Sequence, residues 1–160
     1  MGREIRMVPP HWEHPKYEPS EVNHAWQRGA FKPLMQGYAE AAADFLTMAN
    51  EKGLQEAIDY CGQAPDKNDY VPDWPDGTAT WFQVYETVSE GSPVTPPFAT
   101  EAELVEYLVN YGDFWSQRKG EGGFSRAAAE AFVKDKWAPS MIVDNGKITV
   151  GIESAARSHD

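Results

Sequence analysis

The stretch WFQVYETVSEGSPVTPPFATEAELVEYLV, residues 81–109, contains the signals of a strand, a turn and a helix in one continuous run. Residues 81–88 are rich in β-branched and aromatic side chains, which favour strands. Apolar residues occupy both parities of this segment, so both faces of the strand can be covered. The pattern therefore predicts a central strand of a sheet over residues 81–88.

A helix is expected immediately after this strand and its turn. Thr100 precedes Glu103 by three residues, the spacing of a capping box in which the hydroxyl accepts from the third helical amide. Gly112 is well placed to end the helix. Between them an apolar stripe recurs at helical spacing: Leu104, Tyr107, Leu108 and Tyr111. These signals predict a helix over residues 100–111.

The C-terminal part adds a second helix and a hairpin. Ser125 can cap a helix over residues 125–135, whose alanines permit close packing on a sheet. Asn145-Gly146 favours the positive φ angles of a two-residue hairpin turn, with alternating apolar residues on both sides. We expect the hairpin 140–152 and the strand 81–88 to form one small antiparallel sheet that packs with both helices, giving an α+β fold.

The N-terminal half has a different character. Five prolines interrupt residues 1–35, which predicts an extended arm that packs on the body. Apolar spacing predicts helices within residues 38–61, followed by a loop to residue 80. At 160 residues the chain is expected to form a single domain. Its expected parts are the arm (1–35), an acidic helical and loop region (36–80), an α+β core (81–153) and a tail (154–160).

The net charge of −11 is concentrated in the middle of the chain. Residues 36–116 carry fifteen acidic and two basic residues. Such a field repels nucleic acid and membrane surfaces and attracts basic protein surfaces, although it could also serve only to keep the protein soluble. Candidate partner-binding residues lie in the acidic, aromatic loop: Asp66, Asp69, Asp73, Trp74 and Asp76.

The sequence contains no complete catalytic or metal-binding motif. One cysteine and no C-x-x-C pair exclude the standard cysteine-based zinc modules. The loop aspartates do not fit a calcium-binding loop, because position 6 counted from Asp66 is Val71 rather than glycine. We therefore expect no metal and no cofactor, and an enzyme is the weaker hypothesis. Candidate ligand-binding residues, which could line an aromatic pocket, are Tyr85, Glu86 and Trp137.

Three segments together resemble a family of small uncharacterised proteins of tailed bacteriophages and prophages: REIRMVPPHWEHP near the start, VYETVSEGSPVTPPFATEAELVEYL, and FSRAAAEAFVKDKWAPSMIVDNGKI. The resemblance implies a protein made inside a bacterium during infection or lysogeny. Some longer relatives carry paired Cys-x-x-Cys motifs that this chain lacks, so no zinc site is transferred to it. The family supplies no reaction and no functional residues.

These observations lead to three hypotheses of function. The first is a phage accessory protein that binds a host or phage protein with a basic surface, in host takeover or counter-defence. The alternatives are a small-ligand binder or enzyme, and a minor structural component of the particle. No segment approaches the roughly 18 apolar residues of a membrane span, and the N-terminus lacks the apolar core of a signal peptide. The expected location is therefore the cytoplasm of the bacterial host, without a membrane partner.

Overall fold

The computed structural model describes residues 2–87, 91–138, 141–144, 147–150 and 152–153, with the backbone alone for 141–144 and 147–150. The chain has an α+β fold, as predicted, and it divides into two compact units. The main unit comprises residues 1–32 and 74–160, and the helical unit comprises residues 33–73. The sequence analysis expects one domain. The expected acidic region 36–80 instead falls largely in a unit of its own, within which its helices pack.

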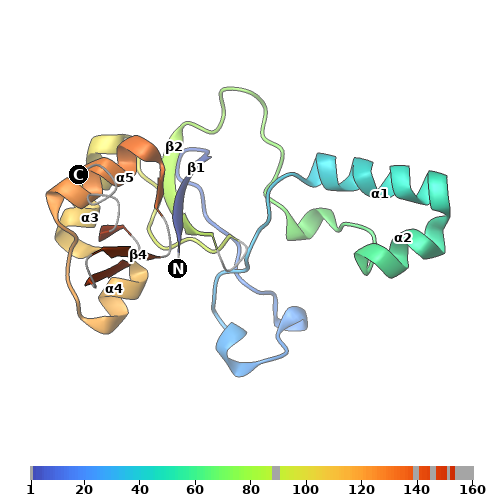
Figure 1. Ribbon diagram of the computed structural model, residues 1–160, viewed down its shortest axis with the longest axis horizontal. Helices are drawn as coiled ribbons and strands as arrows, with labels where there is room; N and C mark the ends of the chain where they lie inside the picture. The colour runs from blue at the N-terminus through green and yellow to red at the C-terminus, as the bar shows by residue number, and fades with distance from the viewer. Residues whose placement is uncertain (1, 88–90, 139–140, 145–146, 151, 154–160) are drawn as a thin grey trace. The chain divides into compact units, whose positions relative to one another are not determined.

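The sheet of the main unit has three strands in the order β2-β1-β3. The central strand β1 (Arg3–Val8) pairs antiparallel with β2 (Trp81–Glu86) along its whole length, from Arg3 opposite Glu86 to Val8 opposite Trp81. On its other side β1 pairs with the short strand β3 (Trp137–Ala138). Figure 1 shows β1 and β2 side by side.

This arrangement corrects two sequence-based expectations. The segment expected to be an extended arm supplies the central strand, over REIRMV, which contains no proline or glycine. Pro9 and Pro10 follow directly and end this strand rather than preclude it. The predicted strand 81–88 therefore pairs with β1 and not with the C-terminal hairpin.

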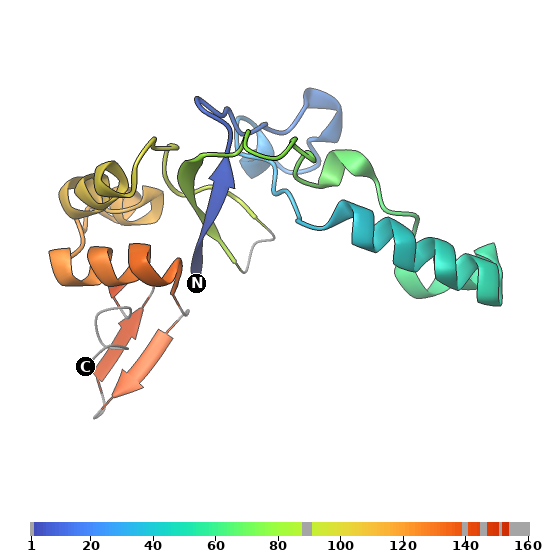
Figure 2. The same ribbon diagram turned by 90° about the horizontal axis from the view of Figure 1, so that it is seen from above.

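The C-terminal hairpin forms a separate two-stranded sheet. Strand β4 (Met141–Asp144) pairs antiparallel with β5 (Lys147–Val150), and Asp144 lies opposite Lys147. This register leaves two residues for the turn, as the Asn-Gly pair predicts, although residues 145–146 lie outside the described residues. Figure 2 shows the hairpin next to α5 (Arg126–Asp135), away from β1 and β2.

The predicted helices of the main unit are confirmed. Helix α3 (Glu101–Tyr111) begins after Thr100, whose hydroxyl accepts from Glu103 N at 3.1 Å. Helix α5 begins after Ser125, whose hydroxyl accepts from Ala128 N at 3.2 Å. A short helix, α4 (Phe114–Lys119), was not predicted, and it is capped by the carboxylate of Asp113.

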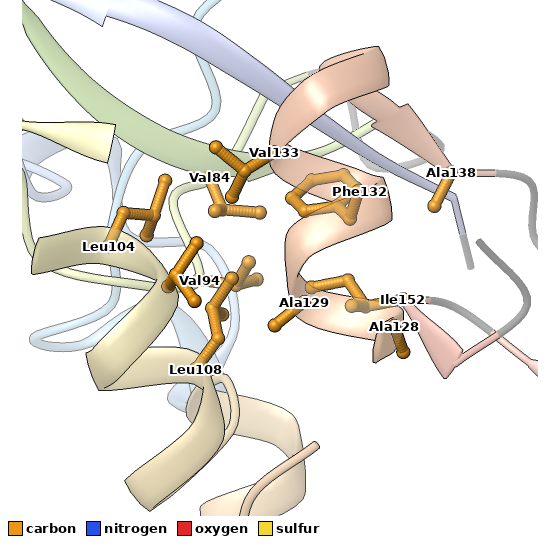
Figure 3. Close-up of a cluster of buried hydrophobic side chains, with 11 residues drawn as sticks. Val84, Val94, Leu104, Leu108, Ala128, Ala129, Phe132, Val133, Ala138 and Ile152 are labelled. Carbon is orange, nitrogen blue, oxygen red and sulfur yellow. The ribbon is translucent and has the colours of Figure 1, made fainter. Parts of the chain in front are cut away.

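One face of the sheet packs on α3 and α5 to form the hydrophobic core. Val84 of β2 and Ala138 of β3 point toward the two helices (Figure 3). The core also includes Leu104, Val105 and Leu108 of α3, Ala128, Ala129, Phe132 and Val133 of α5, and Val94 and Ile152. Small alanines on α5 let the helix approach closely, as the sequence pattern indicates.

The opposite face of the sheet contacts the segment that follows β1, residues 9–32, here termed the arm loop. Its two ends pair, since Tyr17 N donates to Ala30 O and Lys32 N donates to Pro15 O. Two 3₁₀ turns lie between them, η1 (Pro19–Glu21) and η2 (Ala25–Gln27). This closure places residues from both ends of the arm loop beside β2.

The helical unit consists of α1 (Tyr38–Lys52), α2 (Leu54–Cys61) and the turn η3 (Lys67–Asp69). Gly53 joins the two helices at φ 96°, a conformation that favours glycine. The entry and exit of the unit are tied by backbone hydrogen bonds from Met35 N to Asp69 O and from Val71 N to Met35 O. No helix among the described residues is both long and apolar enough to cross a membrane.

Candidate functional site

The main unit contains a cleft of about 570 Å³ on the sheet face that the arm loop covers. Aromatic side chains from the arm loop and from α4 form its walls, and polar side chains lie along β2 and the following loop. We term it the aromatic cleft. Its principal lining residues are Trp12, His14, Phe31, Gln83, Thr95 and Phe114. A volume of this size lies within the range of about 300–1,000 Å³ that is usual for small-ligand sites.

A chain of hydrogen bonds links two residues that line the aromatic cleft, His14 and Gln83, through the hydroxyl of Tyr85. His14 Nδ1 is 3.1 Å from the hydroxyl of Tyr85, and His14 Nε2 is 2.6 Å from the carbonyl oxygen of Lys32. A carbonyl can only accept, so Nε2 carries a proton and donates it. In the neutral ring, Nδ1 is then an acceptor that faces the Tyr85 hydroxyl.

The same hydroxyl has a second acceptor. It lies 2.9 Å from Gln83 Oε1, and the other end of that amide is fixed because Gln83 Nε2 donates to the carbonyl oxygen of Thr95 at 2.8 Å. One tyrosyl proton is therefore shared between two acceptors, Gln83 Oε1 and His14 Nδ1, while His14 is neutral. If His14 were protonated, its Nδ1 would donate to the Tyr85 hydroxyl, and that hydroxyl would donate to Gln83, so every contact in the chain would have a donor and an acceptor. Burial of the imidazole opposes this positive charge.

The electrostatic environment keeps this network uncharged at neutral pH. Burial, with a smaller contribution from nearby Arg6, lowers the pKa of His14 to about 4, against the opposing effect of the hydrogen bond to Lys32. Burial raises the pKa of Tyr85 to about 12, with Trp12 and Arg6 acting in the opposite direction. An imidazole with a pKa of about 4 is a weak base at neutral pH, so this geometry favours binding over acid–base catalysis.

The structure does not bring the three candidate ligand-binding residues together. Tyr85 hydrogen-bonds to His14 and Gln83, which line the aromatic cleft, but Glu86 points to the other face of the sheet because successive strand residues alternate. Glu86 is buried opposite Arg3. Trp137 lies across β1 from Tyr85, since both pair with Glu4, and its side chain is 55% exposed.

Sequence reasoning missed His14 and Gln83 as members of the site. In the sequence, His14 stands in PPHWEHP, where the prolines argue against a helix that could align its two histidines on a metal ion. The contact of His14 with β2 depends on the closure of the arm loop, which no local pattern reveals. Across the described ranges, no three His, Cys, Asp or Glu side chains are grouped in a way that could hold a metal ion.

The second candidate site lies within the helical unit, whose residues are all described. A groove of about 640 Å³ runs along one face of α1, with residues 60–70 forming the opposite wall. The lining residues of α1 recur at helical spacing: Ala41, Asp44, Phe45 and Met48. Asp66 and Asp69 contribute carboxylates from the other wall. We term this site the acidic groove.

Two of the five candidate partner-binding residues line the acidic groove. Asp66 does so while its carboxylate accepts from Asn68 N at 2.9 Å and caps η3, and Asp69 lies at the end of the same turn. Asp73 is exposed and does not line the groove. Trp74 and Asp76 belong to the main unit, where the Trp74 ring packs edge-on against Trp12.

No protein-family model, curated protein or solved structure matches this chain.

Proposed function

We propose that the protein acts by binding another protein through its helical unit. The observation that carries this proposal is the exposure of large apolar side chains within an acidic surface. Leu54 and Tyr60, which both belong to α2, are 61% and 80% exposed. Large apolar side chains grouped on one small unit are typical of interaction surfaces.

The charge of the helical unit supports a basic partner. Residues 33–73 carry eight acidic and two basic residues. This field attracts positively charged protein surfaces and accelerates encounter with them, and it repels phosphate backbones and anionic lipids. Binding that depends on such a field weakens as salt is added, because the Debye length shortens to about 8 Å at physiological ionic strength.

The biological setting we propose follows from the resemblance to proteins of tailed bacteriophages and prophages. The chain is then made in the cytoplasm of a bacterium, and its partner is a host or phage protein with a basic surface. An accessory protein of this kind acts by occupying a surface, in host takeover or counter-defence, and needs no catalytic centre.

The test compares the wild-type chain with a variant in which four aspartates become asparagine: Asp66, Asp69, Asp73 and Asp76. Asparagine is also a good N-cap, so the variant should fold with little loss of stability. Tagged versions of both chains are purified from the bacterial host, and the captured proteins are identified by mass spectrometry. We expect a stoichiometric partner with the wild type and a reduced yield with the variant. Equal recovery of that partner by both chains would rule out these aspartates as the binding surface.

A second candidate function is the binding of a small ligand in the aromatic cleft. The observation that favours it is the preformed, uncharged chain of His14, Tyr85 and Gln83 beneath aromatic walls. Preorganised polar groups within an apolar site are the usual composition of ligand pockets. A thermal-shift screen of small aromatic compounds tests it, with Phe31→Ala as the variant that should lose any stabilisation.

A further inference from the structure

We infer that the acidic groove binds one basic amphipathic helix of the partner, with apolar side chains of that helix inserted between α1 and residues 60–70. This inference rests on the proposed function, because it names the structural class of the partner that the helical unit recognises. Three features of the groove carry it: its floor, its backbone and its rim.

The floor of the groove is apolar and adaptable. Phe45 of α1 is 7% exposed and lines the groove, and Tyr70 lines it from the opposite wall. Two methionines, Met35 and Met48, complete the lining. Methionine is unbranched and polarisable, so surfaces that contain it can repack around different apolar side chains. Such a floor suits apolar anchors of a partner.

The backbone around the groove favours a helix over an extended segment. The amides and carbonyls of α1 bond within the helix, and the Met35 amide and carbonyl already bond to Asp69 and Val71. None of the residues that line the groove belongs to a strand, so the groove presents no strand edge to which an extended peptide could add. An extended segment would bury its own polar backbone without partners, whereas a helix satisfies its backbone internally.

The geometry of α1 points the same way. Ala41, Asp44, Phe45 and Met48 form a ridge with the i, i+3, i+4, i+7 spacing of one helix face. A second helix can lay its own ridge beside this one, because helices pack by placing the ridges of one into the grooves of the other. The seven-residue span from Ala41 to Met48 is about two turns, or roughly 10 Å, enough for two successive anchor side chains.

The rim of the groove selects a basic helix. Asp44 lies on the α1 wall, and Asp66 and Asp69 lie on the opposite wall, so carboxylates stand on both sides of the apolar floor. None of the residues that line the groove is basic. A helix with lysine or arginine flanking its apolar stripe places positive charge against both walls at once, whereas an acidic helix is repelled from both.

The experiment measures the binding of a labelled synthetic helix of leucine and lysine by fluorescence anisotropy. The control is a peptide of identical composition in scrambled order, which has the same charge and no apolar stripe. Both are titrated with the full-length chain at low and at high salt. We expect the amphipathic peptide to bind at least about tenfold more tightly than the scrambled one.

Two matched pairs of variants on α1 locate the binding site. Met48→Gln removes an apolar side chain from the groove, and Leu46→Gln makes the same change at an exposed position outside it. Asp44→Asn removes a rim charge, and Glu51→Gln removes a charge that does not line the groove. We expect Met48→Gln to weaken binding by about tenfold and Asp44→Asn to reduce its salt dependence, while the two controls change little. Circular dichroism establishes that each variant keeps its helices.

The outcomes separate this inference from the proposed function. If both peptides bind equally and all charge variants weaken them alike, the acidic surface binds partners but the groove does not select a helix. If Leu46→Gln weakens binding and Met48→Gln does not, the interaction uses another face of α1. In either case the inference is overturned and the proposed function survives. Failure of both peptides to bind at low salt, together with unchanged capture by the four-aspartate variant, overturns both.

Discussion

His14 Nδ1 lies 3.1 Å from the hydroxyl oxygen of Tyr85, and this contact joins the arm loop to strand β2. The imidazole is buried, and its other nitrogen donates to the carbonyl of Lys32 at the far end of the same loop. One side chain thus holds both ends of the arm loop against the sheet. Its protonation state should therefore influence the stability of the fold.

The first prediction concerns that pH dependence. Burial lowers the pKa of His14 to about 4, below the ordinary value of 6.5 expected in the unfolded chain. Between these values the unfolded chain binds more protons, so stability falls as the pH is lowered from about 6.5 toward 4. The full shift corresponds to roughly 3 kcal/mol, of which about 2 kcal/mol is lost between pH 7 and pH 5. Urea midpoints at pH 7 and pH 5 measure it, and His14→Gln should reduce the difference. A variant with the same acid sensitivity as the wild type would assign that sensitivity to other groups.

The second prediction concerns the buried ion pair between Arg3 and Asp113, whose Nε and Oδ2 atoms are 2.9 Å apart. Arg3→Met leaves the buried carboxylate of Asp113 without this guanidinium, at a cost of about 3–5 kcal/mol in the free energy of unfolding. The exposed pair of Arg126 and Glu106 provides the control, because water screens it. Arg126→Met should leave the denaturation midpoint almost unchanged. Similar losses in the two variants would contradict the prediction.

The third prediction concerns the close approach of Gly123 to α3. A Cβ atom at Gly123 would lie 1.7 Å from the backbone carbonyl oxygen of Val109, so the backbone must move. Gly123→Ala should cost at least about 1–3 kcal/mol, the usual range for overpacking. Gly120→Ala meets no atom within 4 Å and carries only the strain of its φ of +70°. Thermal denaturation of the two variants compares them, and Gly123→Ala should melt at the lower temperature.

The fourth prediction concerns the start of α3. The Thr100 hydroxyl accepts from Glu103 N, so Thr100→Ala should destabilise the fold by about 1 kcal/mol. Thr100→Ser keeps the acceptor and should stay close to the wild type. Chemical denaturation distinguishes the two variants. If Thr100→Ala and Thr100→Ser lost the same free energy of unfolding, the methyl group of Thr100, and not its hydroxyl, would stabilise this end of the helix.

The elements that sequence could predict are those specified locally. Helix α3 has its cap at Thr100, its apolar stripe and its terminal Gly112 within a single short segment, and the hairpin has its turn and both strands in sequence. Strand β1 is only six residues long, has no regular alternation and lies next to two prolines, and its partners are far away in the chain. Arg3 lies opposite Glu86 on one side and Ala138 on the other.

The candidate sites follow the same rule. Asp66 and Asp69 stand out in the sequence as part of an acidic loop, and the structure places both in the acidic groove. Asp44 and Met48 look like ordinary helix residues until α1 packs beside residues 60–70. Tyr85 was a candidate from its strand, but its partner His14 comes from the arm loop. Grouping of residues from separate segments depends on tertiary structure, which local patterns do not encode.

The central position of β1 has a consequence for synthesis on the ribosome. This strand is translated first, yet its neighbours are residues 81–86 and 137–138. At bacterial elongation rates the nascent chain carries an unpaired β1 for on the order of ten seconds before β2 emerges, and longer before β3 does. The helical unit, by contrast, is complete by residue 73 and can fold while the main unit is still being made. The nascent chain therefore gains its acidic helical unit before its sheet is assembled.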